Sequence, residues 1–433
     1  MRKYDSYKKS TFEWMEEIPS HWILTKNRFG FQKCSNGINE SDDTPVLSLT
    51  TKGVKVKTNL SFGKSTESYI GHQLVEKGDI VFTPRDFDQT PILSDVSNYF
   101  GCISNLYIVD KTKEGVLNHF VNYYWYGLKY SVDYFKNFSH GMRYSFNRFQ
   151  FDEIPLILPP LSEQTQIVSY LDRKTEGIDK LIQTKVRKIE LLKEYRTSLI
   201  NEVVTKGLNP NVEMKDSGVE WIGEIPSHWE TTKLKFQGEV IIGLSYTPDN
   251  VVNEGEGTTL VMRSSNVQNG KPSFHDNVFV NSNIPVKLRT KENDILICSR
   301  NGSRNLIGKN CLIPKENENL TWGVFMTVYR SSSPKFFYWL LNSPVFESQS
   351  GLFLTSTINQ LTVSTLENMV VPFVSDLNEQ NEIVSYLDEH TQLIDKTISV
   401  EQRRIDTLKE YRQSLISEVV TGKRKVSNDE EVH

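Results

Sequence analysis

One glycine-containing segment of the chain could in principle bind phosphate. Residues 302–310 read GSRNLIGKN and combine two glycines with a lysine. A Walker-type phosphate loop has four residues between its glycines and a Ser or Thr after the lysine. Here five residues separate Gly302 from Gly308, and Asn310 follows Lys309. The segment therefore does not predict nucleotide binding.

The remaining reactive side chains do not predict catalysis either. The sequence has no cluster of acidic residues with lysine of the nuclease type, and no metal-ligand spacing. Scattered cysteines without a CxxC pair suit a reducing cytoplasm and argue against a structural zinc or a disulfide framework. They are Cys34, Cys102, Cys298 and Cys311. We expect no metal, no cofactor and no enzyme activity in this chain.

A motif rich in tryptophan and histidine occurs twice. Residues 10–22 read STFEWMEEIPSHW and residues 217–229 read SGVEWIGEIPSHW, an offset of 207. Such side chains could act in catalysis or in stacking. Because both copies lie outside the variable parts of the chain, we predict instead that they pack the domains against helices. The residues concerned are Trp14, His21, Trp22, Trp221, His228 and Trp229.

A longer repeat predicts two long helices, which would position the other parts of the chain. Residues 163–206 and 379–422 align without a gap at an offset of 216, with 27 of 44 positions identical. Neither copy contains proline, and Gly207 and Gly422 mark the two ends. Ser162-Glu163 after a double proline predicts an N-cap. Each copy therefore predicts one helix of about 66 Å.

Each predicted helix carries a narrow stripe with alternating spacings of three and four, the period of a coiled-coil seam. In the first copy the stripe is Leu171, Thr175, Ile178, Ile182, Lys185, Ile189, Leu192, Arg196, Leu199 and Val203. In the second copy it is Leu387, Thr391, Ile394, Ile398, Glu401, Ile405, Leu408, Arg412, Leu415 and Val419. This pattern predicts that the two copies pair with each other.

One stripe position changes sign, from Lys185 in the first copy to Glu401 in the second. Antiparallel pairing and parallel pairing in register would both bring these charges together, or both side chains could reach solvent. Parallel pairing would also place Arg196 against Arg412, which is unfavourable. We therefore favour an intramolecular antiparallel coiled coil with pseudo-two-fold symmetry.

The regions between motif and helix differ from each other but share landmarks. Both read as short strands followed by an aromatic-rich helix, residues 119–138 in the first and 333–347 in the second. Gly78-Asp79-Ile80-Val81-Phe82 corresponds to Asn293-Asp294-Ile295-Leu296-Ile297. We predict an α+β protein with one domain fold carrying two different surfaces. The linker before the second motif resembles the N-terminus, which gives the chain a quasi-circular organisation.

Composition sets outer limits on these predictions. The chain has 433 residues, 37% hydrophobic and 24% charged, which is ordinary for a soluble protein of two or three domains. No apolar run is long enough to span a bilayer and the N-terminus has no signal-peptide core, so we expect a cytoplasmic protein. The net charge of −4 does not by itself suggest nucleic acid.

The combined pattern resembles the specificity subunits of type I restriction–modification systems. The IPxxW motif, the GDIVF strand, the PPLSEQxxIVxYLD helix start and the LKEYRxSLIxEVVTG helix end are typical of that family, and the resemblance covers essentially the whole chain. It departs from the family pattern where PFVSDLNEQ replaces the double proline before the second helix. The resemblance implies target recognition domains at 1–160 and 208–376 and coiled-coil helices at 161–207 and 377–422. The tail at 423–433 is charged and lacks periodicity, which predicts disorder.

The resemblance also implies partners. Each recognition domain would read one half of a bipartite DNA target in the major groove. The helices would space the domains and bind two methyltransferase subunits and, through these, restriction subunits, with no membrane involved. S-adenosylmethionine, ATP and Mg²⁺ are then expected on the partner subunits. A coiled-coil scaffold whose heads bind proteins is the main alternative.

Residue types in the variable regions suggest DNA contacts, because Arg and Lys suit guanine, Asn and Gln suit adenine, and Ser, Thr and Lys often contact phosphate. Arg85 and Arg300 follow the corresponding GDIVF-like strands and are the leading pair. The other candidates could also be solvated loop residues. They are Lys52, Lys55, Lys57, Arg143, Tyr144, Asn147, Arg148, Arg263, Ser264, Asn266, Asn301, Arg304, Asn305, Lys309, Thr357, Asn359 and Gln360.

Overall fold

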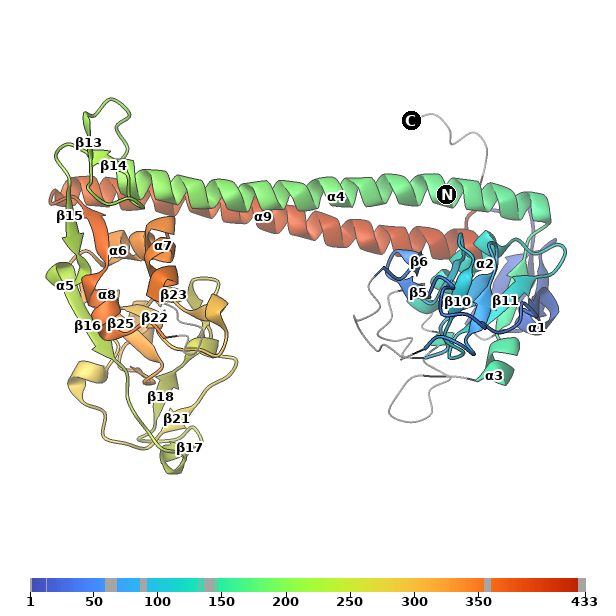
Figure 1. Cartoon of the computed structure of the whole chain (residues 1–433), viewed down its shortest axis with the longest axis horizontal. Coiled ribbons are helices and arrows are strands. Elements are labelled where there is room, and N and C mark those ends of the chain that lie inside the picture. Colours follow the sequence, from blue (N-terminus) through green and yellow to red (C-terminus); the bar gives the residue numbers. More distant parts are fainter. Residues whose placement is uncertain are drawn as a thin grey trace. The chain divides into compact units, whose positions relative to one another are not determined.

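The computed structural model describes residues 2–12, 14–58, 68–85, 92–131, 134–135, 145, 147–353 and 360–426 (Figure 1). The chain forms two compact units. Unit 1 contains residues 1–186 and 402–433, and unit 2 contains residues 187–401. Each unit has a head of strands and short helices together with part of both long helices. The predicted α+β class is confirmed.

The head of unit 1 is built on a four-stranded antiparallel sheet in the order β4-β11-β8-β9. Two-stranded antiparallel pairs surround it: β1 with β2, β3 with β12, β5 with β6 and β7 with β10. The elements of the head are β1 (Tyr7–Lys9), β2 (Glu17–Pro19), β3 (Ile23–Lys26), α1 (Asn27–Gly30), β4 (Phe31–Lys33), β5 (Leu47–Thr50), β6 (Gly53–Val56), β7 (Gln73–Val75), β8 (Ile80–Phe82), β9 (Ser94–Val96), β10 (Gly101–Ile103), β11 (Ile108–Thr112), α2 (Asn118–Ser131), α3 (Arg148–Asp152) and β12 (Pro155–Leu158). The long helix α4 (Leu161–Lys206) follows and is divided between the two units.

Aromatic residues hold the unit 1 sheet against α2. The Trp125 ring lies 5.2 Å from Phe31, 4.9 Å from Phe82 and 5.5 Å from Phe151 between centroids. All four side chains are fully buried or nearly so. Burying an aromatic side chain stabilises a fold by about 1.5–3 kcal/mol, so this cluster accounts for the aromatic-rich helix predicted from the sequence.

The head of unit 2 repeats the four-stranded antiparallel sheet, in the order β16-β25-β22-β23, and adds a second sheet, β17-β21-β18-β24, in which β18 and β24 are parallel. Its elements are β13 (Met214–Asp216), β14 (Glu224–Pro226), β15 (Glu230–Lys233), α5 (Leu234–Gln237), β16 (Gly238–Ile242), β17 (Val251–Val252), β18 (Thr259–Met262), β19 (Val267–Gln268), β20 (Lys271–Pro272), β21 (Phe279–Val280), β22 (Ile295–Cys298), β23 (Asn310–Leu312), β24 (Thr321–Trp322), β25 (Met326–Ser331), α6 (Pro334–Leu341), α7 (Pro344–Phe353), α8 (Val363–Asn368), β26 (Val370–Phe373) and α9 (Leu377–Val420).

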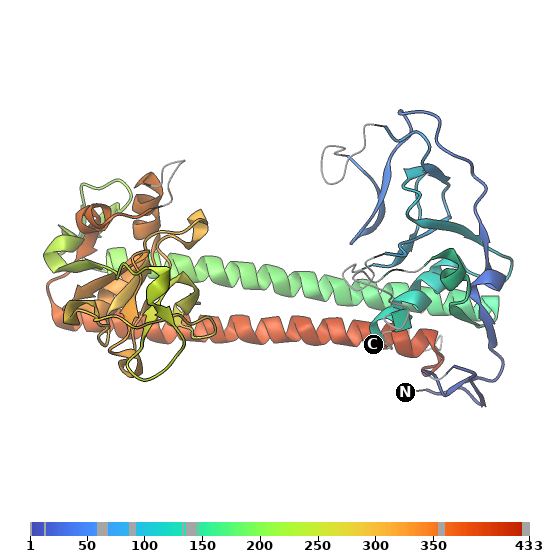
Figure 2. The same cartoon turned by 90° about the horizontal axis from the view of Figure 1, so that it is seen from below.

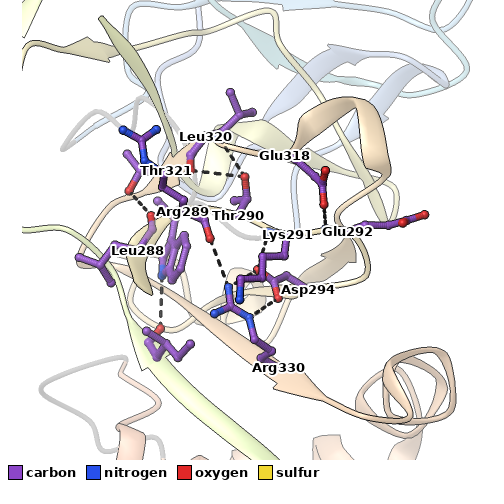
Figure 3. A network of polar contacts seen from close by, with 12 residues as sticks. Leu288, Arg289, Thr290, Lys291, Glu292, Asp294, Glu318, Leu320, Thr321 and Arg330 are labelled. Atoms are coloured by element: carbon purple, nitrogen blue, oxygen red, sulfur yellow. Dashed lines mark hydrogen bonds and ion pairs between the residues drawn. The ribbon is translucent and has the colours of Figure 1, made fainter. Parts of the chain in front are cut away.

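A buried ion pair fixes the start of β22 (Figure 3). The Arg330 guanidinium on β25 donates to both carboxylate oxygens of Asp294, at 2.7 and 2.6 Å. The same carboxylate accepts from the Lys291 amide at 2.9 Å, which closes a turn through Asn293 at φ +65°. In unit 1, Gly78 has φ +96° and the Asp79 carboxylate accepts from the Glu76 amide at 2.8 Å. The matched sequences thus encode the same turn before an equivalent strand.

Helix boundaries differ from the predictions in three places. The helix predicted over 119–138 ends as α2 at Ser131, and most of the remaining range lies outside the described residues. The expected helix 333–347 is two helices, because Pro344 begins α7 after a break at Asn342 and Ser343. The first long helix begins at Leu161, so Ser162 is not its N-cap; the Pro160 carbonyl accepts from the amides of Glu163 and Gln164 instead. In α9 the Asp376 carboxylate takes the capping position and accepts from the Asn378 amide at 2.8 Å.

The two long helices run antiparallel within each unit, which confirms the predicted pairing (Figures 1 and 2). In unit 1, Leu171 and Ile178 of α4 share an apolar cluster with Leu415 and Val419 of α9. In unit 2 the corresponding cluster holds Leu199, Val203, Leu387 and Ile394. The seam residues Ile189 and Ile405 are also buried, and Ile182, Leu192, Ile398 and Leu408 pack against the clusters.

The polar residues of the seam have partners. Arg412 donates to Asp179 at 3.1 Å in unit 1, and Arg196 donates to Asp395 at 2.9 Å in unit 2. Glu401 is buried and accepts from the Lys188 ammonium at 2.8 Å. That Lys185 faces Glu401 stays a prediction. Arg196 and Arg412, which would lie against each other in a parallel pair of helices, therefore each form an ion pair across the seam of the antiparallel pair.

The end of α9 meets the beginning of the chain inside unit 1. Gly422, at φ +74°, packs so closely on Pro19 and Trp22 that a Cβ there would lie 2.4 Å from the Pro19 ring. Beyond it, the Lys425 amide donates to the Arg2 carbonyl at 3.0 Å. In unit 2 the equivalent Gly207 packs on Pro226 and Trp229. The predicted quasi-circular organisation corresponds to these contacts.

Candidate nucleic-acid interface

The strands β8 and β22 end in loops of equivalent position, and each loop presents an exposed arginine. Arg85 forms a backbone bridge with Ser145, shortly before α3, and Arg300 forms one with Gln360, shortly before α8. The structure thus places the leading pair of sequence candidates at matching points of the shared sheet. An arginine held by its backbone while its side chain stays exposed can present its donor fork to a ligand.

A hollow of about 970 Å³ opens beside Arg300 in unit 2. Its lining combines cations and hydroxyls with aromatic and aliphatic groups: Tyr246, Pro248, Val251, Arg263, Ser264, Ser265, Arg300, Asn301, Gly302, Gly323, Val324, Phe325 and Met326. Four of the predicted contact residues, Arg263, Ser264, Arg300 and Asn301, therefore come together there. They are contributed by two separate segments of the chain, at 263–264 and 300–301.

Contacts within this hollow hold its polar groups in place. The Arg300 guanidinium lies 5.1 Å from the centre of the exposed Phe325 ring. Asn301 donates to the Ser264 hydroxyl at 3.2 Å, and Lys309 donates to the Ser264 carbonyl at the same distance. Arg263 pairs with Asp276 at 2.9 Å. Stacked and tethered donors of this kind suit hydrogen bonding to base edges or phosphates.

Unit 1 has a hollow of about 1020 Å³ beside Arg85. It also contains Asn147 and Arg148, together with Lys33, Cys34, Ser35, Gln73, Asn105 and Tyr107. Burial and the neighbouring Asp79 raise the pKa of the Cys34 thiol to about 12, which favours its protonated form at neutral pH. The hollow therefore offers hydrogen-bonding groups rather than reactive ones.

Arg148 has a structural role that the sequence did not reveal. Its guanidinium donates to both oxygens of the fully buried Asp110, at 2.6 and 2.8 Å, and to Asp152 at 2.9 Å. Burial raises the pKa of the Asp110 carboxyl, while Arg148 lowers it. A guanidinium with both ends engaged has few donors left for DNA, so we remove Arg148 from the proposed contacts.

Two asparagines also turn out to support the backbone. Asn266 is fully buried and donates to the carbonyls of Ser273 and Asp276, while its oxygen accepts from the Arg263 amide. Asn147 caps α3 by accepting from the Gln150 amide at 3.0 Å. Asn266 therefore positions Arg263 and cannot itself reach a base. Both roles are capping motifs that propensity rules could have suggested.

The remaining candidates are spread more widely. Lys52, Lys55 and Lys57 lie on and after the β5–β6 hairpin, and Lys52 borders a different hollow, lined by α2, α4 and α9. Arg304 and Asn305 are exposed in the turn before β23, while Lys309 and Gln360 are half-buried. Arg143, Tyr144, Thr357 and Asn359 lie outside the described residues. The segment 302–310 leads into β23 rather than into a helix, unlike a phosphate loop.

The IPSHW motifs lock each head to the start of a long helix, as predicted for packing residues. In unit 1, His21 and the Trp22 indole N–H contact Glu163 at 2.8 and 3.2 Å, and the Tyr4 hydroxyl also donates to it. In unit 2, His228 and Trp229 contact Glu379, both at 2.9 Å. The glutamate is the third residue of both helices, where its charge also suits the helix dipole.

Further repeated contacts seat the unlike heads on the helices. Asp172 accepts from the Tyr123 hydroxyl at 2.7 Å in unit 1, and its repeat Asp388 accepts from the Trp339 indole N–H at 3.0 Å in unit 2. Arg412 lies over the Tyr126 ring and its repeat Arg196 over the Trp339 ring. These contacts were not predicted from the sequence. Their helix residues do recur at the offset of 216, as Asp172 with Asp388 and Arg196 with Arg412.

Neither metal sites nor membrane segments are evident within the described residues. No group of three or more His, Cys, Asp or Glu side chains there could hold a metal ion. No helix there is long and apolar enough to cross a membrane.

Comparison with known proteins agrees with this architecture. Residues 33–191 match the family described as type I restriction modification DNA specificity domain. The chain is 28% identical over 65% of its length to a putative type I restriction enzyme MjaX specificity subunit from Methanocaldococcus jannaschii, spanning 62% of that protein. It is 26% identical over 71% of its length to the MjaVIII specificity subunit of the same organism, spanning 71% of it.

Solved structures share the fold. A chain from a study of complex assembly and conformational transition of the type I R-M system matches with a TM-score of 0.71, at 16% identity, over 94% of this chain and 99% of that one. The HsdS subunit from Thermoanaerobacter tengcongensis matches with a TM-score of 0.52, at 16% identity, over 94% and 98%. The paired long helices with two α+β heads are therefore a fold shared with these solved structures. Residues 33–191 thus belong to the type I restriction modification DNA specificity domain family, and the chain as a whole is similar to type I specificity subunits.

Proposed function

We propose that unit 1 reads one half of a bipartite DNA target and unit 2 the other half. The observation that carries this proposal is that Arg85 and Arg300 occupy equivalent points of the shared sheet but border hollows with different linings. Heads that share a four-stranded sheet but differ in their surfaces suit a target whose two halves differ in sequence. The segments 1–160 and 208–376 would then be the target recognition domains.

The long helices would dock two methyltransferase subunits and, through them, restriction subunits. The identity of 27 of 44 positions in two copies supports this, because two identical partners require the same surface twice. The paired helices, at 46 and 44 residues, are also long enough to act as a ruler between half-sites.

In this proposal the chain itself performs no chemistry. The partner subunits would bind S-adenosylmethionine, ATP and Mg²⁺, and would methylate an adenine flipped out of each half-site. The described hollows offer hydrogen-bonding side chains for positioning DNA, and we expect the complex to act in the cytoplasm.

Exchange of one head tests the proposal. Residues 24–158 are replaced by the corresponding segment of a relative with a different target, and genomic methylation is mapped by sequencing in cells with the full complex. We expect one half of the methylated sequence to change; the reciprocal replacement of residues 231–373 should change only the other half. A change in both halves, or in neither, contradicts the proposal. Protein binding by the heads would leave gel shifts without sequence preference.

A second variant tests the helices as a ruler. Deleting one heptad from each long helix should shorten the gap between the two half-sites while leaving both half-sites intact, because the heads are not altered. An unchanged gap would contradict this part of the proposal.

A further inference from the structure

The repeat that includes the IPSHW motif continues into the heads. At the same offset of 207, residues 25–29 read TKNRF and residues 232–236 read TKLKF. Each copy ends in a phenylalanine preceded by a cation. The sequences on either side of this short stretch, such as Ile23-Leu24 against Glu230-Thr231, have diverged.

Both copies fold into the same local structure. The strand β3 leads into α1 and then β4, while β15 leads into α5 and then β16. The first residue of each short helix, Asn27 or Leu234, is fully buried. Two residues later the side chain faces the other way, and Phe29 and Phe236 are 61% and 70% exposed.

Each exposed ring is accompanied by a cation that is tied to the head. The Arg28 guanidinium lies 5.0 Å from the centre of Phe29, and the Lys235 ammonium lies 5.3 Å from the centre of Phe236. Arg28 pairs with Glu153 at the end of α3, and Lys235 donates to Asn368 at the end of α8 at 3.2 Å. The ring and its cation are thus held in equivalent positions by different partners.

Other exposed apolar residues of the heads do not recur in this way. Ile23 is 62% exposed, but Glu230 stands at the matching position of unit 2. Among the large apolar side chains exposed on the described parts of the heads, Phe29 and Phe236 are the pair at the offset of 207. A benzyl ring kept in water at the same place in two otherwise diverged domains points to a binding surface that both domains share.

We propose that Phe29 and Phe236 insert into the same apolar, acid-rimmed socket on two copies of the methyltransferase subunit, one copy per unit. This inference rests on the proposed function and identifies the residue through which each head contacts a methyltransferase subunit. The two DNA halves differ, whereas the two methyltransferase subunits are identical, and a repeated contact fits the identical partner. A benzyl ring has no hydrogen-bonding group for phosphate or base edges, but it fills an apolar pocket, and the adjoining cation complements acidic groups.

The test uses the full chain mixed with its cognate methyltransferase subunit, with the mass of the complex measured by native mass spectrometry and light scattering. Wild type should bind two methyltransferase subunits. Phe29→Ser and Phe236→Ser should each weaken binding at one position by about tenfold or more, and the double variant at both. Ile23→Ser and Val286→Ser, at other exposed apolar positions, are matched controls and should bind as wild type does. Unchanged thermal unfolding would show that the variants remain folded.

The possible results separate the inference from the proposed function. If wild type binds two methyltransferase subunits and the double variant binds them equally well, the inference is overturned while the proposed function stands. If wild type binds none, the proposed function itself fails. A double variant that loses only DNA affinity, or that abolishes a self-association of wild type, would assign the two rings to DNA or to a second copy of this chain and would also overturn the inference.

Discussion

The two units share a four-stranded antiparallel sheet but surround it with different strands. In unit 1 the order β4-β11-β8-β9 is accompanied by two-stranded pairs, whereas in unit 2 the order β16-β25-β22-β23 is joined by a second four-stranded sheet. The contacts to the long helices are nevertheless repeated, with Glu163 and Glu379 holding the IPSHW motifs and Asp172 and Asp388 holding an aromatic side chain of the head.

This comparison shows which parts of a head are constrained. The parts that touch the helices are alike: the IPSHW motifs are identical, and the residues that meet Asp172 and Asp388 are both aromatic. The helices themselves share 27 of 44 positions. The parts that hold the sheet together differ. Unit 2 anchors Asp294 with Arg330 from a neighbouring strand, while unit 1 anchors Asp110 with Arg148 from α3. Each head has its own solution to the burial of a carboxylate.

The largest expected effect concerns these buried pairs. Asp294→Ala should destabilise unit 2 by about 3–5 kcal/mol, because it leaves the Arg330 guanidinium largely buried and unpaired. Asp110→Ala should destabilise unit 1 less, since the Arg148 side chain is 38% exposed against 22% for Arg330 and can be rehydrated. Denaturant unfolding followed by hydrogen exchange measures the loss in each unit. Asp276→Ala, at an exposed pair, is the control; equal losses for all three would contradict the explanation.

The next effect concerns specificity. Arg300→Ala should reduce discrimination at one base pair of one half-site by about 1–3 kcal/mol, and Arg85→Ala should do the same in the other half-site. Methylation rates on duplexes substituted at each position of the target would measure this. Arg304→Ala, in an exposed turn nearby, serves as the comparison. If both arginine variants affected the same half-site, the assignment of one half to each unit would be wrong.

A smaller effect is expected where the motif meets the helix. Glu379→Ala leaves the buried Trp229 indole N–H without its acceptor and should destabilise unit 2 by about 1–2 kcal/mol. Glu163→Ala should cost unit 1 somewhat more, because Tyr4 donates to Glu163 in addition to Trp22. Amide exchange in the first turns of α4 and α9 reports each loss separately. If either variant made amide exchange faster in both helices, the contacts of Glu163 and Glu379 with their motifs would not be independent of each other.

The smallest effect concerns the cross-seam ion pairs. Double-mutant cycles on Arg196 with Asp395 and on Arg412 with Asp179 should each give about 0.2–1 kcal/mol, because the carboxylates are half exposed. The two values should agree and should fall as salt is raised. A coupling well above this range in one unit alone would show that the units do not share the same seam.

Repetition and periodicity made much of this architecture predictable. The spacing of Leu171, Ile178 and Leu199 gave the long helix, and the arginines at 196 and 412 gave its direction, because each lacked an acceptable partner in the parallel arrangement. The landmark Asp79 and its counterpart Asp294 correctly placed the equivalent strands and, with them, the exposed Arg85 and Arg300.

What could not be predicted depends on contacts between distant segments. Arg148 and Asn266 have the residue types of DNA contacts, but their partners, Asp110 and the carbonyls of Ser273 and Asp276, become neighbours only in the folded head. No local pattern distinguishes an arginine that holds a buried carboxylate from one that faces a groove. The break before Pro344 was visible in the sequence and should have been predicted.

The contribution of α9 to unit 1 has a consequence for how the protein folds during synthesis. Unit 2 is one continuous stretch, residues 187–401, and can close as soon as the ribosome has released it. The core of unit 1 includes Leu415, Ile416, Val419 and Val420, which are translated after all of unit 2. The head of unit 1 is therefore translated first but completed after the head of unit 2. Its apolar surface stays exposed until nearly the whole chain has been made. Premature stops within the final helix should consequently damage the N-terminal head and spare the C-terminal one.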